Sequence, residues 1–163
     1  RLRHQMRDDD LVVRWGGEEF LVYARTTEPL LARALAQRLL DVVGRTPVDY
    51  ESLHITASAS IGFVSLPLAP HGLRLPWERA IDLVDTVMYL AKVHGRNRAY
   101  GLERMLATDP LQAAELAARL EGAWQAGDVT LVSLEGPKLG SQAGTPAPQP
   151  QQPPKEDGHA LSQ

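Results

Sequence analysis

Two adjacent glycines between two β-forming runs are the feature that most restricts the fold of this chain. Residues 11–13 and 20–23 are rich in the aliphatic and aromatic side chains that favour strands, and Gly16 and Gly17 lie between them. Glycine tolerates the positive φ angles of tight turns without a steric penalty. The pattern therefore predicts a β-hairpin with the glycines at its tip.

The rest of the chain alternates between helical and strand periodicity. Apolar residues recur every three or four positions in three segments, which is the spacing of a helix with one buried face. In another segment they alternate strictly with polar residues, as in a half-buried strand. The expected helices span residues 29–44, 77–93 and 110–125, and the expected strands span residues 55–64, 98–102 and 129–134.

Composition excludes several classes of protein. The 163 residues include no cysteine, which rules out a disulfide framework and thiolate metal sites and is compatible with a reducing cytoplasm. The formal net charge of -3 gives no global electrostatic case for nucleic-acid binding. No apolar run approaches the roughly 20 residues that span a bilayer, so we expect no membrane contact by this segment. Because the first residue is Arg1, we expect a fragment or a processed piece.

The tip of the predicted hairpin carries residues suited to phosphate chemistry. Two carboxylates, Glu18 and Glu19, follow the glycine pair Gly16 and Gly17. Glycines let a backbone approach a ligand closely, and carboxylate oxygens suit magnesium, which is usually shared with substrate phosphates. A solvated hairpin that happens to end in two acids accounts for the same residues, so this segment alone leaves its role open.

The second segment with chemical potential lies on the polar face of the helix predicted over residues 77–93. Asp85, Tyr89, Lys92 and Arg96 follow one another at helical spacing. Lysine offers a point charge and arginine a planar fork, and both suit a triphosphate. A solvated helix face is the alternative interpretation of the same pattern.

Both segments, with a third between them, resemble the GGDEF domain of diguanylate cyclases. Residues 14–20 read RWGGEEF, which is similar to the family signature in its GGEEF form. Residues 55–62 read ITASASIG, similar to the family's T-x-S-x-G strand, and residues 85–98 resemble its AD-x-ALY-x-AK-x-x-GRN motif. The resemblance covers residues 7–102 and corresponds to the C-terminal part of that domain.

The resemblance implies an α+β fold with a mostly antiparallel central sheet flanked by helices, like the palm of nucleotide cyclases and polymerases. The N-terminal half of the family domain, with a further metal-binding aspartate and guanine-reading residues, is absent from the sequence. We therefore expect an exposed sheet edge and a chain that is inactive alone. Residues 1–102 are expected to form the partial GGDEF domain, 103–136 a helix–strand extension, and 137–163 a disordered tail rich in Pro and Gln.

The resemblance also implies an activity, the condensation of two GTP molecules into cyclic di-GMP with release of pyrophosphate. It implies Mg²⁺, with Mn²⁺ as an alternative, and a homodimer in which two domains face each other. One acid of the signature would bind the metal and help to activate the ribose 3′-hydroxyl, while basic residues would contact the triphosphate. The matching positions are Glu18 and Glu19 for catalysis, Glu18 for the metal, and Gly16, Gly17, Lys92 and Arg96 for the substrate.

A product-inhibition site is implied by residues upstream of the signature. The family places an R-x-x-D motif five residues before it, and Arg7 and Asp10 fit that register. Arginine can stack on guanine or fork onto its acceptor edge, and aspartate can accept from guanine donors. Arg38 lies about where the family supplies a secondary arginine. The alternative is an exposed acidic turn beside an arginine.

Two further functions compete with the cyclase. A catalytically inactive GGDEF remnant would bind cyclic di-GMP as a receptor, and a structural dimerisation domain would bind no nucleotide. The intact acids Glu18 and Glu19 favour the enzyme, whereas the absent first half favours the receptor. The parent protein is expected in the cytoplasm, with anchoring in the inner membrane by an upstream sensor region left open.

Overall fold

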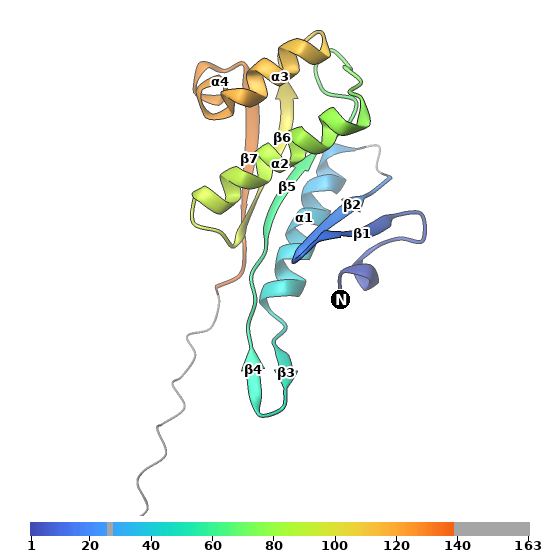
Figure 1. The fold of residues 1–163 in the computed structure, drawn as a ribbon, viewed down its shortest axis with the longest axis vertical. Coiled ribbons are helices and arrows are strands. Elements are labelled where there is room, and N and C mark those ends of the chain that lie inside the picture. The colour runs from blue at the N-terminus through green and yellow to red at the C-terminus, as the bar shows by residue number, and fades with distance from the viewer. Residues whose placement is uncertain (26–27, 139–163) are drawn as a thin grey trace, which may run out of the picture.

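A computed structural model describes residues 1–25 and 28–138, which form a mixed α+β structure (Figure 1). The α+β class expected from the sequence is confirmed. After an N-terminal hairpin, three strands follow the first long helix, and a second long helix, a strand, two short helices and a last strand complete the described chain. The elements are η1 (Leu2–Gln5), β1 (Leu11–Gly16), β2 (Glu19–Tyr23), α1 (Pro29–Gly44), β3 (Val48–Tyr50), β4 (Leu53–Ile55), β5 (Ser60–Val64), α2 (Trp77–Val93), β6 (Arg98–Met105), α3 (Pro110–Ala118), α4 (Leu120–Ala126) and β7 (Val129–Glu135).

The strands of the described residues form three small sheets in which antiparallel pairing predominates. β1 pairs with β2, and β3 pairs with β4, each as an antiparallel hairpin. The third sheet has the order β5-β6-β7, with β6 parallel to β5 and antiparallel to β7. β6 is thus the central strand of the largest sheet, and β3–β4 projects from the body beyond the end of α1 (Figure 1).

The core lies on both faces of the β5–β6–β7 sheet. Alternate residues of β6 point to opposite faces, so that Tyr100 and Leu102 face one set of helices while Ala99 faces another. On the first face α2, α3 and α4 cover the sheet, and on the second face Ala36 and Leu40 of α1 pack against it. The sheet is therefore the middle of three layers.

α2 lies unusually close to β5 because Gly62 faces it. A Cβ atom at this position would overlap the backbone nitrogen of Met88 and the carbonyl oxygen of Val84. No side chain separates strand and helix there, so the α2 backbone rests directly on the strand. Val87, one turn along, is fully buried as a result.

Two segments differ from the sequence-based expectation. The single strand expected over residues 55–64 is two strands, β4 and β5, separated by residues 56–59. The helix expected over residues 110–125 is broken at Arg119, whose φ of -125° and ψ of 39° leave the helical region. The break reorients the chain so that Leu120 and Ala123 of α4 enter the core beside Leu116 of α3.

Residues 103–135 belong to the same core as the residues before them. β7 pairs with β6 along nearly its whole length, from Arg98 opposite Glu135 to Met105 opposite Val129. The strand expected at residues 98–102 extends to Met105 as β6. It is the central strand of its sheet, because β7 pairs with it on the side opposite β5. The predicted tail falls mostly on residues 139–163, which lie outside the described residues, and the proposed domain boundaries stay predictions. None of the helices in residues 1–25 and 28–138 is long and apolar enough to cross a membrane.

The close approach at Gly62 leads to a prediction about stability. Gly62→Ala should lower the free energy of unfolding by about 3 kcal/mol, because the new methyl group meets backbone that cannot rotate away. Urea unfolding monitored by circular dichroism measures this change.

Gly122→Ala is the matched control, because a Cβ atom there meets nothing within 4 Å and the residue lies in α4. It should raise the free energy of unfolding by about 0.5–1 kcal/mol through helix propensity. Equal effects of the two substitutions would contradict the packing of α2 on β5.

Candidate active site

The tip of the β1–β2 hairpin is a two-residue loop, Gly17 and Glu18, closed by an arginine. Gly17 has a φ of +50°, which glycine adopts without strain. The guanidinium of Arg14 donates to the carbonyl oxygen of Gly17 through Nε at 3.0 Å and NH2 at 2.8 Å. Around Gly16 and Gly17 a Cβ atom would meet nothing within 4 Å, so the loop is held from one side and open on the other.

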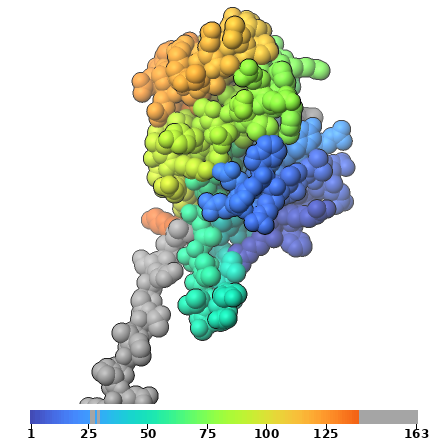
Figure 2. Space-filling model, in the orientation of Figure 1, coloured from blue at the N-terminus to red at the C-terminus, as the bar shows by residue number. Residues whose placement is uncertain are grey.

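Glu19 and Lys92 bring the hairpin and α2 together. Lys92 Nζ lies 3.1 Å from Glu19 Oε1, across 73 residues of sequence. Both side chains remain about half exposed, at 39% for Lys92 and 47% for Glu19. Figure 2 shows the hairpin, in blue, lying against the yellow-green surface of α2. Two motifs that the sequence keeps apart therefore meet at one surface.

Glu18 is the carboxylate of the hairpin that stays available. It is exposed at the loop, and within the described residues it makes no hydrogen bond or ion pair. Glu19, in contrast, is engaged by Lys92. No group of three or more histidine, aspartate or glutamate side chains in the described part of the chain is arranged to hold a metal ion. Glu18 can therefore supply one hard oxygen ligand from this chain.

The turn after α2 presents Arg96 to solvent. Gly95, Arg96 and Asn97 all have positive φ, at 107°, 60° and 48°. The Arg96 side chain is exposed and makes no hydrogen bond or ion pair to the residues that the structure describes. Asp85 and Tyr89 are exposed on the same helix. Lys92 is thus brought to the hairpin, while Arg96 lies one turn further with its guanidinium free.

Arg7 and Asp10 line a small polar hollow of about 90 Å³. The carboxylate of Asp10 accepts hydrogen bonds from the backbone N–H of Arg7 at 2.9 Å and of Arg25 at 3.1 Å. Asp10 therefore also closes the turn that leads into β1. Arg3, which the sequence reasoning missed, lines the same hollow. It precedes Arg7 by four residues, and no pattern in the sequence distinguishes it from the other basic residues nearby.

Arg38 has a different neighbour from the one expected of a product-binding residue. Its NH2 group donates to the backbone carbonyl of Gln5 at 2.6 Å, which ties α1 to η1. It is not among the residues that line the hollow at Arg7 and Asp10. Its place in a product site stays a prediction.

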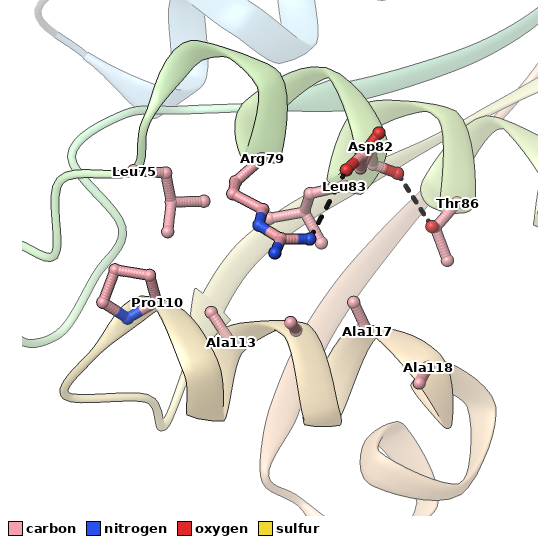
Figure 3. A pocket seen from close by; sticks show the side chains of 10 residues that line it. Leu75, Arg79, Asp82, Leu83, Thr86, Pro110, Ala113, Ala117 and Ala118 are labelled. Atoms are coloured by element: carbon pink, nitrogen blue, oxygen red, sulfur yellow. Dashed lines mark hydrogen bonds and ion pairs between the residues drawn. The ribbon is translucent and has the colours of Figure 1, made fainter.

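A second, larger hollow of about 220 Å³ lies between α2 and α3 (Figure 3). Ala113 and Ala117 of α3 line one side, and Arg79 and Asp82 of α2 line the other. Arg79 lies 3.8 Å from Asp82, and the Thr86 hydroxyl donates to the Asp82 carbonyl oxygen at 2.8 Å. None of its lining residues belongs to the hairpin or to the predicted substrate and product sites, so this hollow is separate from them.

The hairpin and α2 both lie in the part of the chain that matches a known protein family. The chain matches the family described as "Diguanylate cyclase, GGDEF domain" over residues 1–98. It is 34% identical to diguanylate cyclase A of Treponema denticola over 92 residues, which cover 56% of this chain and 24% of that protein. It is 30% identical to the cyclic di-GMP phosphodiesterase NbdA of Pseudomonas aeruginosa over 118 residues, 71% of this chain and 14% of that protein.

A third relative matches further along the chain. The bifunctional diguanylate cyclase/cyclic di-GMP phosphodiesterase MucR of Pseudomonas aeruginosa is 28% identical over 149 residues, 88% of this chain and 21% of that protein. The chain belongs to the GGDEF domain family of diguanylate cyclases. It spans only 14% to 24% of the length of these relatives.

The Glu19–Lys92 pair leads to a prediction about its strength. A double-mutant cycle with Glu19→Gln and Lys92→Met should give a coupling free energy below about 1 kcal/mol, because both side chains are half exposed and screened by water. Urea unfolding of the four proteins measures it.

The pair Arg119–Asp128, at 3.3 Å and similarly exposed, is the matched control and should couple as weakly. A coupling above about 2 kcal/mol at Glu19–Lys92 alone would show a desolvated pair. Lys92 would then not be available to another anion.

Proposed function

We propose that this chain is the C-terminal part of a diguanylate cyclase catalytic domain, which joins two GTP molecules into cyclic di-GMP and releases pyrophosphate. The observation that carries the proposal is the Glu19–Lys92 contact at 3.1 Å. It brings the hairpin that bears Glu18 to the helix that bears the basic residues. Family membership supports the same reaction.

Glu18, whose carboxylate is free, is the residue that would bind the metal ion and activate the attacking hydroxyl. Magnesium takes one or two protein carboxylates and completes its shell with substrate phosphates and water, so a single exposed glutamate at an open loop fits it, and manganese is an alternative. When bound, the ion would supply positive charge beside the α-phosphate. Glu18 would orient the ribose 3′-hydroxyl and accept its proton.

The glycine loop and the basic residues are assigned to the triphosphate. The open space around Gly16 and Gly17 lets phosphate oxygens approach the backbone. Arg96 offers a free guanidinium that can bind two phosphate oxygens at once. Lys92 would exchange Glu19 for phosphate, because its present ion pair is exposed and weak. Both cations would stabilise the negative charge that develops on the leaving pyrophosphate.

We propose that catalysis requires a homodimer and residues beyond these 163. Each GTP would lie on one domain, and each 3′-hydroxyl would attack the α-phosphate held by the other domain. Glu18 is the exposed carboxylate that the described part of the hairpin offers without a partner. We expect the chain alone to be inactive and a version extended upstream to the complete domain to be active.

A receptor for cyclic di-GMP is the second candidate, favoured by the polar hollow at Arg7. Arg3, Arg7 and Asp10 are among the residues that line it, so two guanidinium groups and a carboxylate belong to its lining residues. These groups suit guanine edges and phosphates. In this function the chain would bind the dinucleotide without forming it.

Product formation from GTP and Mg²⁺ tests the cyclase. The extended protein should form cyclic di-GMP, and Glu18→Gln should reduce the rate at least about 100-fold, because the amide neither binds the metal as well nor accepts the proton. Chromatography of the reaction mixture measures the product. Glu115→Gln, an exposed position on α3, is the matched control and should leave the rate unchanged.

The receptor has its own test in equilibrium binding of cyclic di-GMP. Arg7→Ala is the variant of choice, because Asp10→Ala would also remove two hydrogen bonds to the backbone. Tight binding that is lost in Arg7→Ala, together with no product from the extended protein, would overturn the cyclase and establish the receptor.

A further inference from the structure

The turn that carries Arg96 is held in a conformation that it would not adopt alone. Arg96 and Asn97 follow Gly95 with φ values of 60° and 48°. Arginine pays roughly 1–2 kcal/mol in the left-handed region and stays there only when its surroundings hold it, whereas asparagine enters that region more readily. The backbone N–H of Arg96 donates to the Ala91 carbonyl oxygen at 2.9 Å, which ends α2. Further contacts must fix the remainder of the turn.

His94, directly before the turn, is bonded to the segment that follows β6. Its Nε2 atom lies 2.7 Å from Glu121 Oε1 on α4, and its Nδ1 atom lies 2.8 Å from the hydroxyl of Tyr100. A carboxylate only accepts, so Nε2 carries the proton and donates to Glu121. In the neutral ring Nδ1 then accepts from the Tyr100 hydroxyl. Both nitrogens of the imidazole are therefore used.

Tyr100 and Trp124 complete this contact on the apolar side. Tyr100 is 5% exposed, and its ring meets His94 edge-on at 5.4 Å between centroids. Trp124 of α4 also meets Tyr100, again edge-on, at 6.1 Å between centroids. The imidazole thus lies between a hydrogen-bonding partner on α4 and a buried ring on β6.

Asn97, directly after Arg96, is bonded to the two residues that follow β7. Its backbone carbonyl accepts from the N–H of Gly136 at 2.8 Å, and its side-chain nitrogen donates to the Pro137 carbonyl oxygen at 2.9 Å. A Cβ atom at Gly136 would overlap the Asn97 side chain. Only glycine at position 136 permits this approach.

We propose that the segment from α4 to Pro137, which includes β7, is a positioning element for triphosphate binding, with His94 and Asn97 as the residues through which it acts. These two residues bracket Gly95 and Arg96, and each is anchored to a different part of that segment. Arg96 itself makes no side-chain contact within the described residues, so its direction depends on the turn. The inference rests on the proposed role of Arg96 and Lys92 in binding GTP.

Amide hydrogen exchange on the 163-residue chain tests whether the contact between His94 and α4 holds the turn at Arg96. Glu121→Ala removes the charged acceptor of an exposed contact, so the amide of Arg96, which donates to the Ala91 carbonyl oxygen, should exchange about two- to fivefold faster. Glu121→Gln keeps an acceptor oxygen and should restore most of the protection. Glu115→Ala, an exposed glutamate on α3, is the matched control and should leave exchange unchanged.

GTP binding with Mg²⁺ by the extended protein tests whether the position of this turn affects binding of the triphosphate. Glu121→Ala should raise the dissociation constant and KM for GTP about two- to fivefold with little change in kcat, because a displaced Arg96 weakens the bound substrate and the transition state alike. Gly136→Ala should act in the same direction from the other flank. A general loss of stability would instead lower kcat and the fraction of active protein without this separation.

The outcomes distinguish the inference from the proposed function. A wild-type protein that binds no GTP would overturn the function and the positioning role with it. GTP binding by the wild type that is unchanged in Glu121→Ala, or exchange of the Arg96 amide that is unchanged, would overturn the positioning role alone. If Gly136→Ala does not fold, Glu121→Ala still decides, because the Glu121 side chain is 53% exposed.

Discussion

The packing of α2 on β5 is the contact on which the other features of the chain depend. At Gly62 no side chain separates helix from strand, and Val87 and Leu90 enter the core beside it. This contact determines which face of α2 is buried. It therefore also determines which face carries Lys92 to the hairpin, and where the turn after the helix begins. A helix held less closely would leave these positions free to vary.

The C-terminal end of α2 consequently joins three parts of the molecule. Lys92 meets Glu19 of the hairpin, and two residues later His94 meets Glu121 of α4. Arg96 lies between these contacts and the bond from Asn97 to the residue that follows β7. The exposed pair at Lys92 is weak and exchangeable, and the similarly exposed contact between His94 and Glu121 is backed by the buried ring of Tyr100. A firm support beside an exchangeable cation is a suitable arrangement for binding and releasing a triphosphate.

Local patterns predicted most of the elements. The helix at residues 77–93 and the glycine hairpin match the structure because an apolar stripe and turn-forming glycines are properties of the local sequence. The strand expected at residues 55–64 was wrong as a single element, since alternation looks the same in one strand and in two. The helix expected at residues 110–125 was wrong as a continuous one, because burial of Leu120, not propensity, breaks it at Arg119.

The sequence by itself determined the family, the elements and the residues with chemical potential, because motif spacing, periodicity and turn chemistry are written within a few residues of one another. Only the tertiary structure decided which of those residues meet. It joined Glu19 to Lys92, engaged Asp10 with two backbone amides, and bonded His94 to Glu121. Such contacts arise from how separate elements pack in space, and no local pattern encodes a distance between them.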